Sequence, residues 1–138
     1  METTGLVVCA AVLAVAAAFG LVRGRRDGRL KVRDDGERAF GAAELGAELG
    51  ERATLVQFSS AFCQPCRATR RTLSDVAGMV DGVAHVELDA EERLELVREL
   101  GILRTPTVLV LDARGCVVRR AAGQPRKADV IAALGEAV

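Results

Sequence analysis

Two cysteines separated by two residues are the feature of this sequence that most directly implies chemistry. They lie in Cys63-Gln64-Pro65-Cys66, shortly after an apolar run that ends at Phe58. Cysteines at this spacing lie on one face of a helix, one turn from each other, so their sulfurs can close a small disulfide ring. The first cysteine falls at the expected helix start, where unpaired N–H groups and the helix dipole favour a thiolate. Because the thiolate is the nucleophile of thiol–disulfide exchange, the pair predicts redox chemistry.

The two cysteines are expected to have different roles. We predict that Cys63 is the attacking thiol, because it lies at the exposed start of the helix, and that Cys66 is the resolving thiol, because it points toward the core. Pro65 fits the first helical turn, where a missing N–H costs little. Two alternatives stay open: a pair of ordinary buried cysteines, and a zinc site. A structural zinc site needs about four ligands, whereas the chain has no second Cys-x-x-Cys and a single histidine.

Hydrophobic periodicity predicts the elements that position this pair. Residues 54–58 are expected to form a short buried strand, and residues 66–79 a helix whose apolar positions face inward. Four more strands are expected: an edge strand at 30–33, a strand at 83–88, a central strand at 107–111 and, after a turn at 112–115, its hairpin strand at 116–119. Three more helices are expected: one at 42–49 ended by Gly50, one that Asp89 caps, and one at 127–137. The inward residues are Leu94, Val97 and Leu100 in the second of these helices and Val130, Ile131 and Leu134 in the third. The order β-α-β-α-β-α-β-β-α predicts one α/β domain.

Composition limits the class of protein. The 138 residues are enough for one domain with a core and an appendage. Apolar residues make up 50% of the chain and aromatic residues 3%, with no Trp or Tyr, so the core must be built from Val, Leu, Ile and Ala. With 19 basic and 19 acidic residues, nothing global indicates nucleic acid. Four cysteines are too few and too unevenly placed for a disulfide-stapled secreted fold. Cys9 looks inert in an apolar segment, and Cys116 is either a small packed residue or the site of a mixed disulfide.

An uncharged stretch from Gly5 to Val22 has about the length needed to cross a bilayer as a helix. A cleaved signal peptide would need positive charge before this stretch, where the chain has Glu2. A lipoprotein signal would want a small residue before Cys9, where the chain has Val8. We therefore expect a retained single-pass anchor in the cell membrane.

The charges after the apolar stretch predict its orientation and the domain boundary. Four arginines follow within residues 23–29, and the positive-inside rule then predicts a cytoplasmic C-terminal domain, with an extracytoplasmic domain as the alternative. We assign residues 1–28 to the anchor and its basic juxtamembrane linker, and residues 29–138 to the globular domain. The charged, glycine-containing segment 23–38 is expected to act as a spacer or to be attracted to anionic headgroups.

The strand, Phe62-Cys-Gln-Pro-Cys66 and the helix, with Thr105-Pro106-Thr107 further along, resemble the thioredoxin superfamily over roughly residues 30–138. The resemblance implies a thioredoxin fold, a central mixed β-sheet flanked by helices, here after an N-terminal transmembrane helix. It implies a cis peptide bond at Pro106 opposite the dithiol. It also implies that Thr105 offers its backbone to an extended substrate segment and a hydroxyl to the sulfurs. The substrate-binding positions implied are Phe62, Gln64, Pro65, Thr105 and Pro106.

The chain departs from the family pattern in three respects. Phe62 replaces the usual Trp, which keeps the apolar cover but removes an indole N–H. Gln-Pro replaces Gly-Pro between the cysteines. Gln57 stands where the family commonly has a buried aspartate, and His85 matches a lysine often near that aspartate. An amide cannot accept a proton from the resolving thiol, so His85, whose ordinary pKa is about 6.5, is a candidate for proton transfer beside Gln57; the alternative is a strand histidine bonded elsewhere.

The resulting functional hypothesis is a membrane-tethered thiol–disulfide oxidoreductase that reduces protein disulfides near the membrane. It needs no cofactor beyond the Cys63–Cys66 disulfide and no metal, and its partners are a disulfide-bearing protein and an electron donor. The alternatives are a non-catalytic thioredoxin-fold module for redox sensing or docking, and a metal carrier that uses the dithiol.

Overall fold

Five strands form one mixed sheet in the order β1-β5-β4-β2-β3. The computed structural model describes residues 2–32 and 38–138. The strands are β1 (Lys31–Val32), β2 (Ala53–Ser59), β3 (Val83–Asp89), β4 (Thr107–Asp112) and β5 (Val117–Ala122). β2 pairs with β3 in parallel and with β4 antiparallel, while β5 pairs antiparallel with both β4 and β1. The predicted central strand is therefore confirmed as β4, and the predicted edge strand as β1; Arg33 lies outside the described residues.

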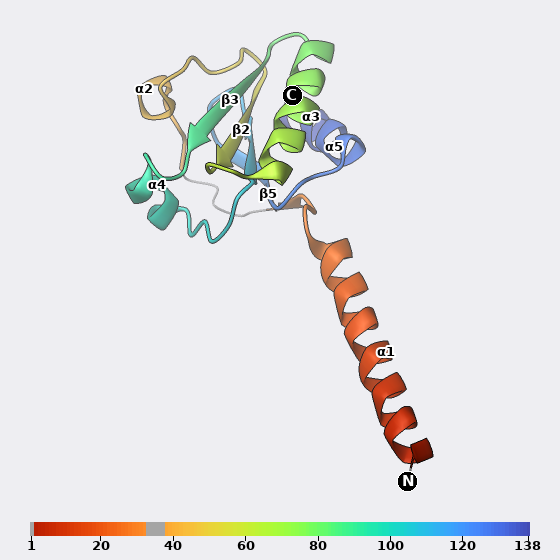
Figure 1. Cartoon of the computed structure of the whole chain (residues 1–138). Coiled ribbons are helices and arrows are strands. Elements are labelled where there is room, and N and C mark those ends of the chain that lie inside the picture. The colour runs from red at the N-terminus through yellow and green to blue at the C-terminus, as the bar shows by residue number, and fades with distance from the viewer. Residues whose placement is uncertain (1, 33–37) are drawn as a thin grey trace.

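Helices cover both faces of the sheet. The helices are α1 (Glu2–Arg26), α2 (Ala42–Leu45), α3 (Gln64–Met79), α4 (Leu94–Glu99) and α5 (Lys127–Ala137). Figure 1 shows the sheet beside α3 and α5, with α1 projecting away from it. Leu73 of α3 and Val130 of α5 share a buried cluster with Leu55 of β2. On the other face, Leu45 of α2 and Leu96 of α4 share a cluster with Val56. All seven residues of β2 are buried because its alternate side chains enter different clusters. The order of elements and the thioredoxin fold predicted from the sequence are confirmed.

Two of the smaller helices differ from the predictions. The first ends at Leu45 rather than at Leu49, because Gly46 adopts a left-handed conformation and Ala47 donates its N–H back to the carbonyl of Ala42. The second, α4, begins at Leu94 with Arg93 in the N-cap position. The prediction that Asp89 caps α4 is wrong: its carboxylate accepts the N–H of Glu91 in a turn that ends β3.

Shifted boundaries also change which side chains face inward. Leu94 is 54% exposed, whereas Leu96 is buried. In α5, Ile131 is 41% exposed and Ala133 is buried in its place. In the hairpin, Cys116 makes an isolated bridge with Ala39 outside β5, which itself runs to Ala122 rather than ending at 119. The remaining inward predictions pack in or against the clusters: Val97 in α4, Leu100 at the C-cap of α4, and Val130 and Leu134 in α5.

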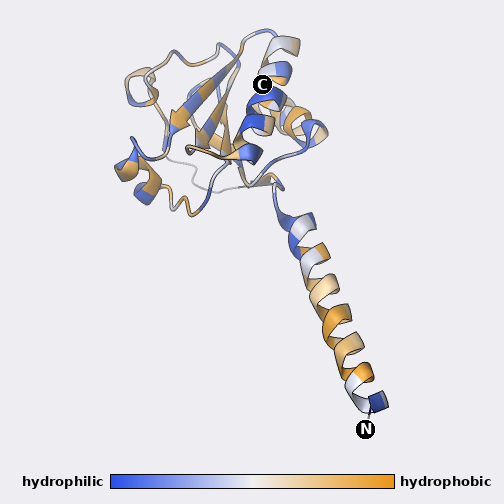
Figure 2. Cartoon of the chain, in the orientation of Figure 1, coloured by the Kyte–Doolittle hydropathy of each residue, from blue (hydrophilic) through white to orange (hydrophobic). Residues whose placement is uncertain are grey.

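The predicted anchor is a continuous helix that projects from the domain. α1 is longer than the predicted stretch, and every residue in it is exposed. Its length and apolar composition are sufficient to cross a membrane, which is compatible with membrane anchoring. Figure 2 shows that its apolar part is followed by a hydrophilic end next to the domain.

The end of α1 is joined directly to the sheet. The N–H of Gly28 donates to the carbonyl of Ala122 at 2.9 Å, and Asp27 forms a 2.8 Å ion pair with Arg104. Gly28 has a φ of +74°, and a Cβ there would lie 2.0 Å from the carbonyl oxygen of Gln124, so only glycine fits. The first part of the predicted linker is thus bound to the domain instead of acting as a spacer. Residues 33–37 of that linker lie outside the described residues.

Candidate active site

The dithiol lies where β2 ends and α3 begins. Cys63 occupies the N-cap position of α3, and its sulfur accepts the N–H of Cys66 at 3.2 Å. Pro65 lies in the first turn, as predicted. Phe62 has a φ of 58°, which directs the chain from the loop into the helix. The sulfur of Cys63 therefore lies at the positive end of a helix of 16 residues, an environment that stabilises a thiolate.

The two cysteine sulfurs are bonded in this structure. The S–S distance is 2.17 Å and the Cα atoms are 5.2 Å apart. Cys66 is 2% exposed, whereas Cys63 is partly exposed. A substrate disulfide approaching from solvent would therefore meet the sulfur of Cys63 first. This geometry agrees with the roles predicted for an attacking and a resolving cysteine.

A loop preceding β4 faces the dithiol. The Thr105–Pro106 peptide bond is cis, which confirms the prediction made from the resemblance. The hydroxyl of Thr105 lies 3.9 Å from the sulfur of Cys63 and 2.7 Å from the hydroxyl of Ser60. Ser60 was not among the predicted site residues. Its place between the end of β2 and the cysteines could have suggested it, but the sequence did not indicate that its hydroxyl contacts that of Thr105.

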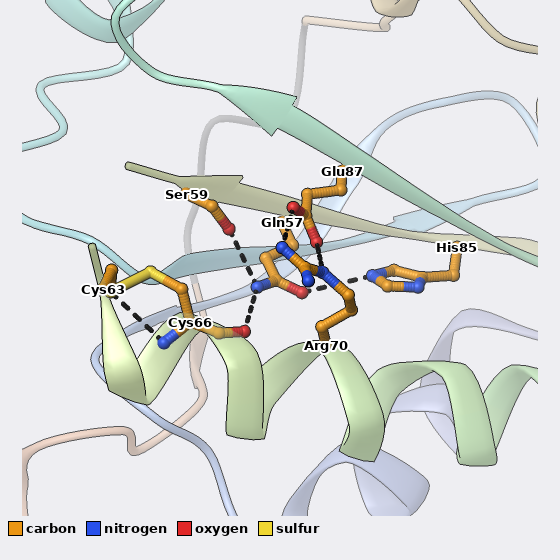
Figure 3. Close-up of polar contacts among 7 residues, drawn as sticks. All are labelled: Gln57, Ser59, Cys63, Cys66, Arg70, His85 and Glu87. Atoms are coloured by element: carbon orange, nitrogen blue, oxygen red, sulfur yellow. Dashed lines mark hydrogen bonds and ion pairs between the residues drawn. A yellow bond between two sulfur atoms is a disulfide. The ribbon is translucent and has the colours of Figure 1, made fainter. Parts of the chain in front are cut away.

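Gln57 links the buried side of the dithiol to His85 (Figure 3). Its side-chain N–H2 group donates to the carbonyl of Cys66 at 2.8 Å and to the hydroxyl of Ser59 at 2.9 Å. Its amide oxygen lies 3.2 Å from Nε2 of His85. A carbonyl oxygen can only accept, so the contact with Cys66 fixes the orientation of the amide. The oxygen of Gln57 must then accept a hydrogen from Nε2 of His85, which assigns the tautomer of the imidazole.

His85 is held in the neutral form more strongly than an exposed histidine would be. Burial lowers the pKa of His85 below its ordinary value of 6.5, because it disfavours the charged imidazolium. The carboxylate of Glu87 opposes this shift and the guanidinium of Arg70 adds to it. Glu87 and Arg70 form a two-bond ion pair beside the imidazole, at 2.5 and 2.6 Å. His85 thus contacts the amide of Gln57 rather than a sulfur, and proton transfer by His85 or Gln57 stays a prediction.

The predicted substrate-binding residues lie around the exposed sulfur. Gln64 and Pro65 are exposed on the first turn of α3. Phe62 is 100% exposed. The expectation that Phe62 covers the dithiol is therefore wrong, because a fully exposed ring does not shield the sulfurs. An exposed ring beside a reactive sulfur is instead available to another molecule.

Metal ligands do not gather anywhere in the part of the chain that the structure describes: no three His, Cys, Asp or Glu side chains lie close enough to hold an ion. Cys116 is a partly buried free thiol at the hairpin, and Cys9 is exposed on α1. The carbonyl of Cys116 accepts the N–H of Asp112 within the turn.

Fold and site together define a class: α/β proteins with a redox dithiol at a helix start, opposite a cis-proline loop. The thioredoxin family model matches residues 42–136, and the chain belongs to the thioredoxin family. Thioredoxin of Alicyclobacillus acidocaldarius subsp. acidocaldarius is 32% identical over 88 residues, which is 63% of this chain and 83% of that protein. Human thioredoxin domain-containing protein 2 is 38% identical over 60 residues, 44% of this chain but only 11% of that protein.

Solved structures of thioredoxins also resemble this chain. Spinach chloroplast thioredoxin f superimposes with a TM-score of 0.56 and 26% identity, over 64% of this chain and 78% of that one. Chloroplastic thioredoxin z gives the same TM-score and identity over 62% and 78%. More than a third of the present chain thus lies outside these superpositions.

Proposed function

We propose that the protein is a membrane-anchored thiol–disulfide oxidoreductase that reduces disulfides of protein substrates near the membrane. One observation carries the proposal: a partly exposed sulfur at a helix start, bonded to a buried partner, beside a cis-proline loop. Family membership supports thiol–disulfide chemistry, and the apolar helix α1 supports the anchor. The membrane anchoring, the direction of the reaction toward reduction and the choice of protein substrates are all proposed.

The reaction is a two-electron exchange between two disulfides. In the reduced protein, the thiolate of Cys63 attacks one sulfur of the substrate disulfide, and the other substrate sulfur leaves as a thiolate and takes up a proton. Cys66 then loses its proton and attacks the sulfur of Cys63 in the mixed disulfide. The substrate leaves as a dithiol, and the Cys63–Cys66 disulfide is formed. A dithiol electron donor returns the pair to its reduced form by the reverse sequence.

Neighbouring groups support each of these steps. The N–H of Cys66, which donates to the sulfur of Cys63, and the helix dipole stabilise the attacking thiolate. The hydroxyl of Thr105 lies close enough to donate a weak hydrogen bond to the same sulfur. Gln57 holds the carbonyl of Cys66 from the buried side, which fixes the resolving cysteine one helical turn from its target. The cis-proline loop can present its backbone to an extended substrate.

Reduction of insulin disulfides with dithiothreitol as donor tests the activity. We expect the full chain in detergent to accelerate insulin reduction, and Cys63→Ser to abolish the acceleration. Cys66→Ser should accumulate a mixed disulfide with the substrate, because the attacking thiol remains and the resolving thiol is lost. Cys116→Ser is the matched control and should retain full activity. An intact protein without turnover would contradict the proposal and favour a docking module that uses the same loop.

A further inference from the structure

We propose that the preferred substrates are disulfides in the juxtamembrane segments of membrane-inserted proteins. The reason is that α1 is attached to the end of the sheet that carries the dithiol, so that the dithiol faces the bilayer. This inference rests on the proposed reductase activity and on the proposed membrane anchoring. It adds the class of substrate that a fixed orientation of the dithiol relative to the bilayer would select.

The anchor joins the sheet at the same end as the dithiol. Phe58, near the end of β2, pairs with Thr107 at the start of β4, and Thr107 pairs with Ala122 at the end of β5. Gly28, which follows α1, donates its N–H to the carbonyl of that same Ala122. Adjacent strands are about 4.8 Å apart, so about 10 Å across the sheet separates the anchor's attachment from the strand that leads to Cys63. Figure 1 shows α1 leaving the domain on the side toward which β2 points and from which α3 begins.

The loop opposite the dithiol is bound to the same attachment. The guanidinium of Arg104, the residue before Thr105, forms its ion pair with Asp27 and also donates to the carbonyl of Ala122 at 2.8 Å. The N–H of Gly123 donates to the carbonyl of Pro106 at 2.8 Å. The cis-proline loop and the end of the anchor therefore share hydrogen-bond partners, so the orientation of the site is coupled to the orientation of α1.

The space between α1 and this loop is open. A groove of about 640 Å³ runs between Phe19 and Val22 on the last turns of α1 and Leu103 and Thr107 beside the cis-proline. Leu103 is 96% exposed on the rim of this groove. A chain lying along the membrane surface can thus approach the cis-proline loop from the bilayer side, and the exposed apolar side chain of Leu103 suits the apolar residues that flank a membrane span.

The short connection limits the height of the site above the bilayer. Residues 23–26, about one helical turn or 5–6 Å, separate the last apolar residue of α1 from the contacts of Asp27 and Gly28. Taken with the width of the sheet, this places the dithiol on the order of 10–20 Å from the hydrocarbon. A substrate cysteine about five residues beyond its own span reaches this distance, since an extended chain covers about 3.3–3.6 Å per residue. A disulfide on a large folded domain would reach the site only if that domain entered the narrow space between the site and the bilayer, so such substrates are disfavoured.

Vesicles that contain the full chain and a transmembrane probe peptide test this inference. The probe carries a disulfide-linked, self-quenched fluorophore pair beyond both ends of its span, so that its insertion direction does not matter. In the near probe the disulfide is about four residues from the span; in the far probe a helical spacer of about 30 residues lifts it by about 45 Å. We expect the near probe to be reduced at least about tenfold faster, because rigid geometry excludes the far site.

A matched variant carries a flexible Gly-Ser insertion of about 15 residues between Arg26 and Asp27, which frees the domain while retaining the contacts of Asp27 and Gly28. Its near-to-far ratio should fall toward one, while its insulin reduction equals that of the unmodified chain. Equal near and far rates in the unmodified chain, or a ratio that survives the insertion, would overturn the inference and leave the reductase proposal standing. If the protein did not reduce insulin, the reductase proposal would be overturned. If it did not sediment with the vesicles, the proposed membrane anchoring would be overturned. Either result would also remove the present inference.

Discussion

Gln57 is an uncharged polar group in a fully buried position directly behind the resolving cysteine. Its side chain satisfies three neighbours at once: the carbonyl of Cys66, the hydroxyl of Ser59 and the imidazole of His85. An amide supplies these contacts without charge, so the site carries no buried carboxylate at this position. The electrostatic support of the dithiol therefore comes from the helix start and from Thr105 rather than from a titrating side chain in β2.

Replacing Gln57 by leucine should destabilise the protein. Leucine keeps much of the volume but leaves Ser59 and His85 without their partner, and a buried polar group that loses its hydrogen bond costs about 1–3 kcal/mol. Urea unfolding of the oxidised protein in detergent measures this loss. Gln124→Leu, at an exposed position, is the control and should change the free energy of unfolding by less than about 0.5 kcal/mol. Equal stability of the two variants would show that the Gln57 network contributes nothing.

His85 is the single histidine of the chain, so its titration can be followed directly by NMR. Burial lowers its pKa in the folded state below 6.5. We expect Glu87→Gln to lower the pKa further, because it removes the charge that favours the imidazolium, and Arg70→Gln to raise it. Shifts in the same direction for both variants would contradict this account of the site.

The same shift makes stability depend on pH. Between the two pKa values the unfolded chain binds more protons than the folded protein, so the contribution of His85 is complete above about 6.5 and is lost as the pH falls toward its lower folded-state pKa. We expect the unmodified protein to lose more stability than His85→Asn between pH 7.5 and about pH 5.5. Chemical unfolding of the oxidised forms at the two pH values measures this difference, and parallel losses would contradict it.

At the level of elements, the strand and helix that carry the dithiol could be predicted because local pattern and tertiary environment agree. β2 is a short apolar run buried on both faces, and α3 shows its inward residues Leu73 and Val76 at helical spacing. α4 was predicted poorly because its leucines are spaced so that more than one face is apolar. Only packing against Val56 and its neighbours selects Leu96 over Leu94. Local sequence also could not reveal that Asp89 bonds within its own turn.

The hairpin between β4 and β5 depends on a glycine that the turn pattern correctly indicated. Gly115 has a φ of +86°, and a Cβ there would lie 2.2 Å from the carbonyl oxygen of Phe40. We expect Gly115→Ala to destabilise the protein by at least about 1 kcal/mol, because both the backbone angle and the contact are unfavourable. Gly135→Ala is the matched control: this glycine is helical and open, so alanine should stabilise α5 by up to about 1 kcal/mol. Thermal unfolding of both variants tests the prediction, which fails if Gly115→Ala is neutral.

For the molecule as a whole, the sequence and the family resemblance were sufficient to place the dithiol opposite the cis-proline and to predict the apolar helix α1, but not to relate α1 to the site. Gly28, Asp27 and Arg104 carry no signal of their contacts, since their partners lie far along the chain. Ser60 and Leu103 were missed for the same reason. Such relations arise from the order of strands, which brings Ala122, Thr107 and Phe58 to one end of the sheet. The orientation of the site relative to the anchor is therefore a property of the folded molecule alone.

The charge at the end of α1 predicts the side of the membrane on which the domain lies. The last turn of α1 carries Arg23, Arg25 and Arg26, and an excess of arginine next to a span favours the cytoplasmic side. We expect a membrane-impermeant maleimide to leave Cys63 unlabelled in intact cells when it is the only cysteine, after Cys9, Cys66 and Cys116 are replaced by serine. The same reagent should label Cys63 once the cells are permeabilised. Thr3→Cys in a chain without other cysteines is the matched control and should be labelled in intact cells, because the opposite end of the span must then lie outside. Labelling of Cys63 before permeabilisation would contradict the predicted orientation. The dithiol would then lie outside the cytoplasm, where its substrates would be exported proteins.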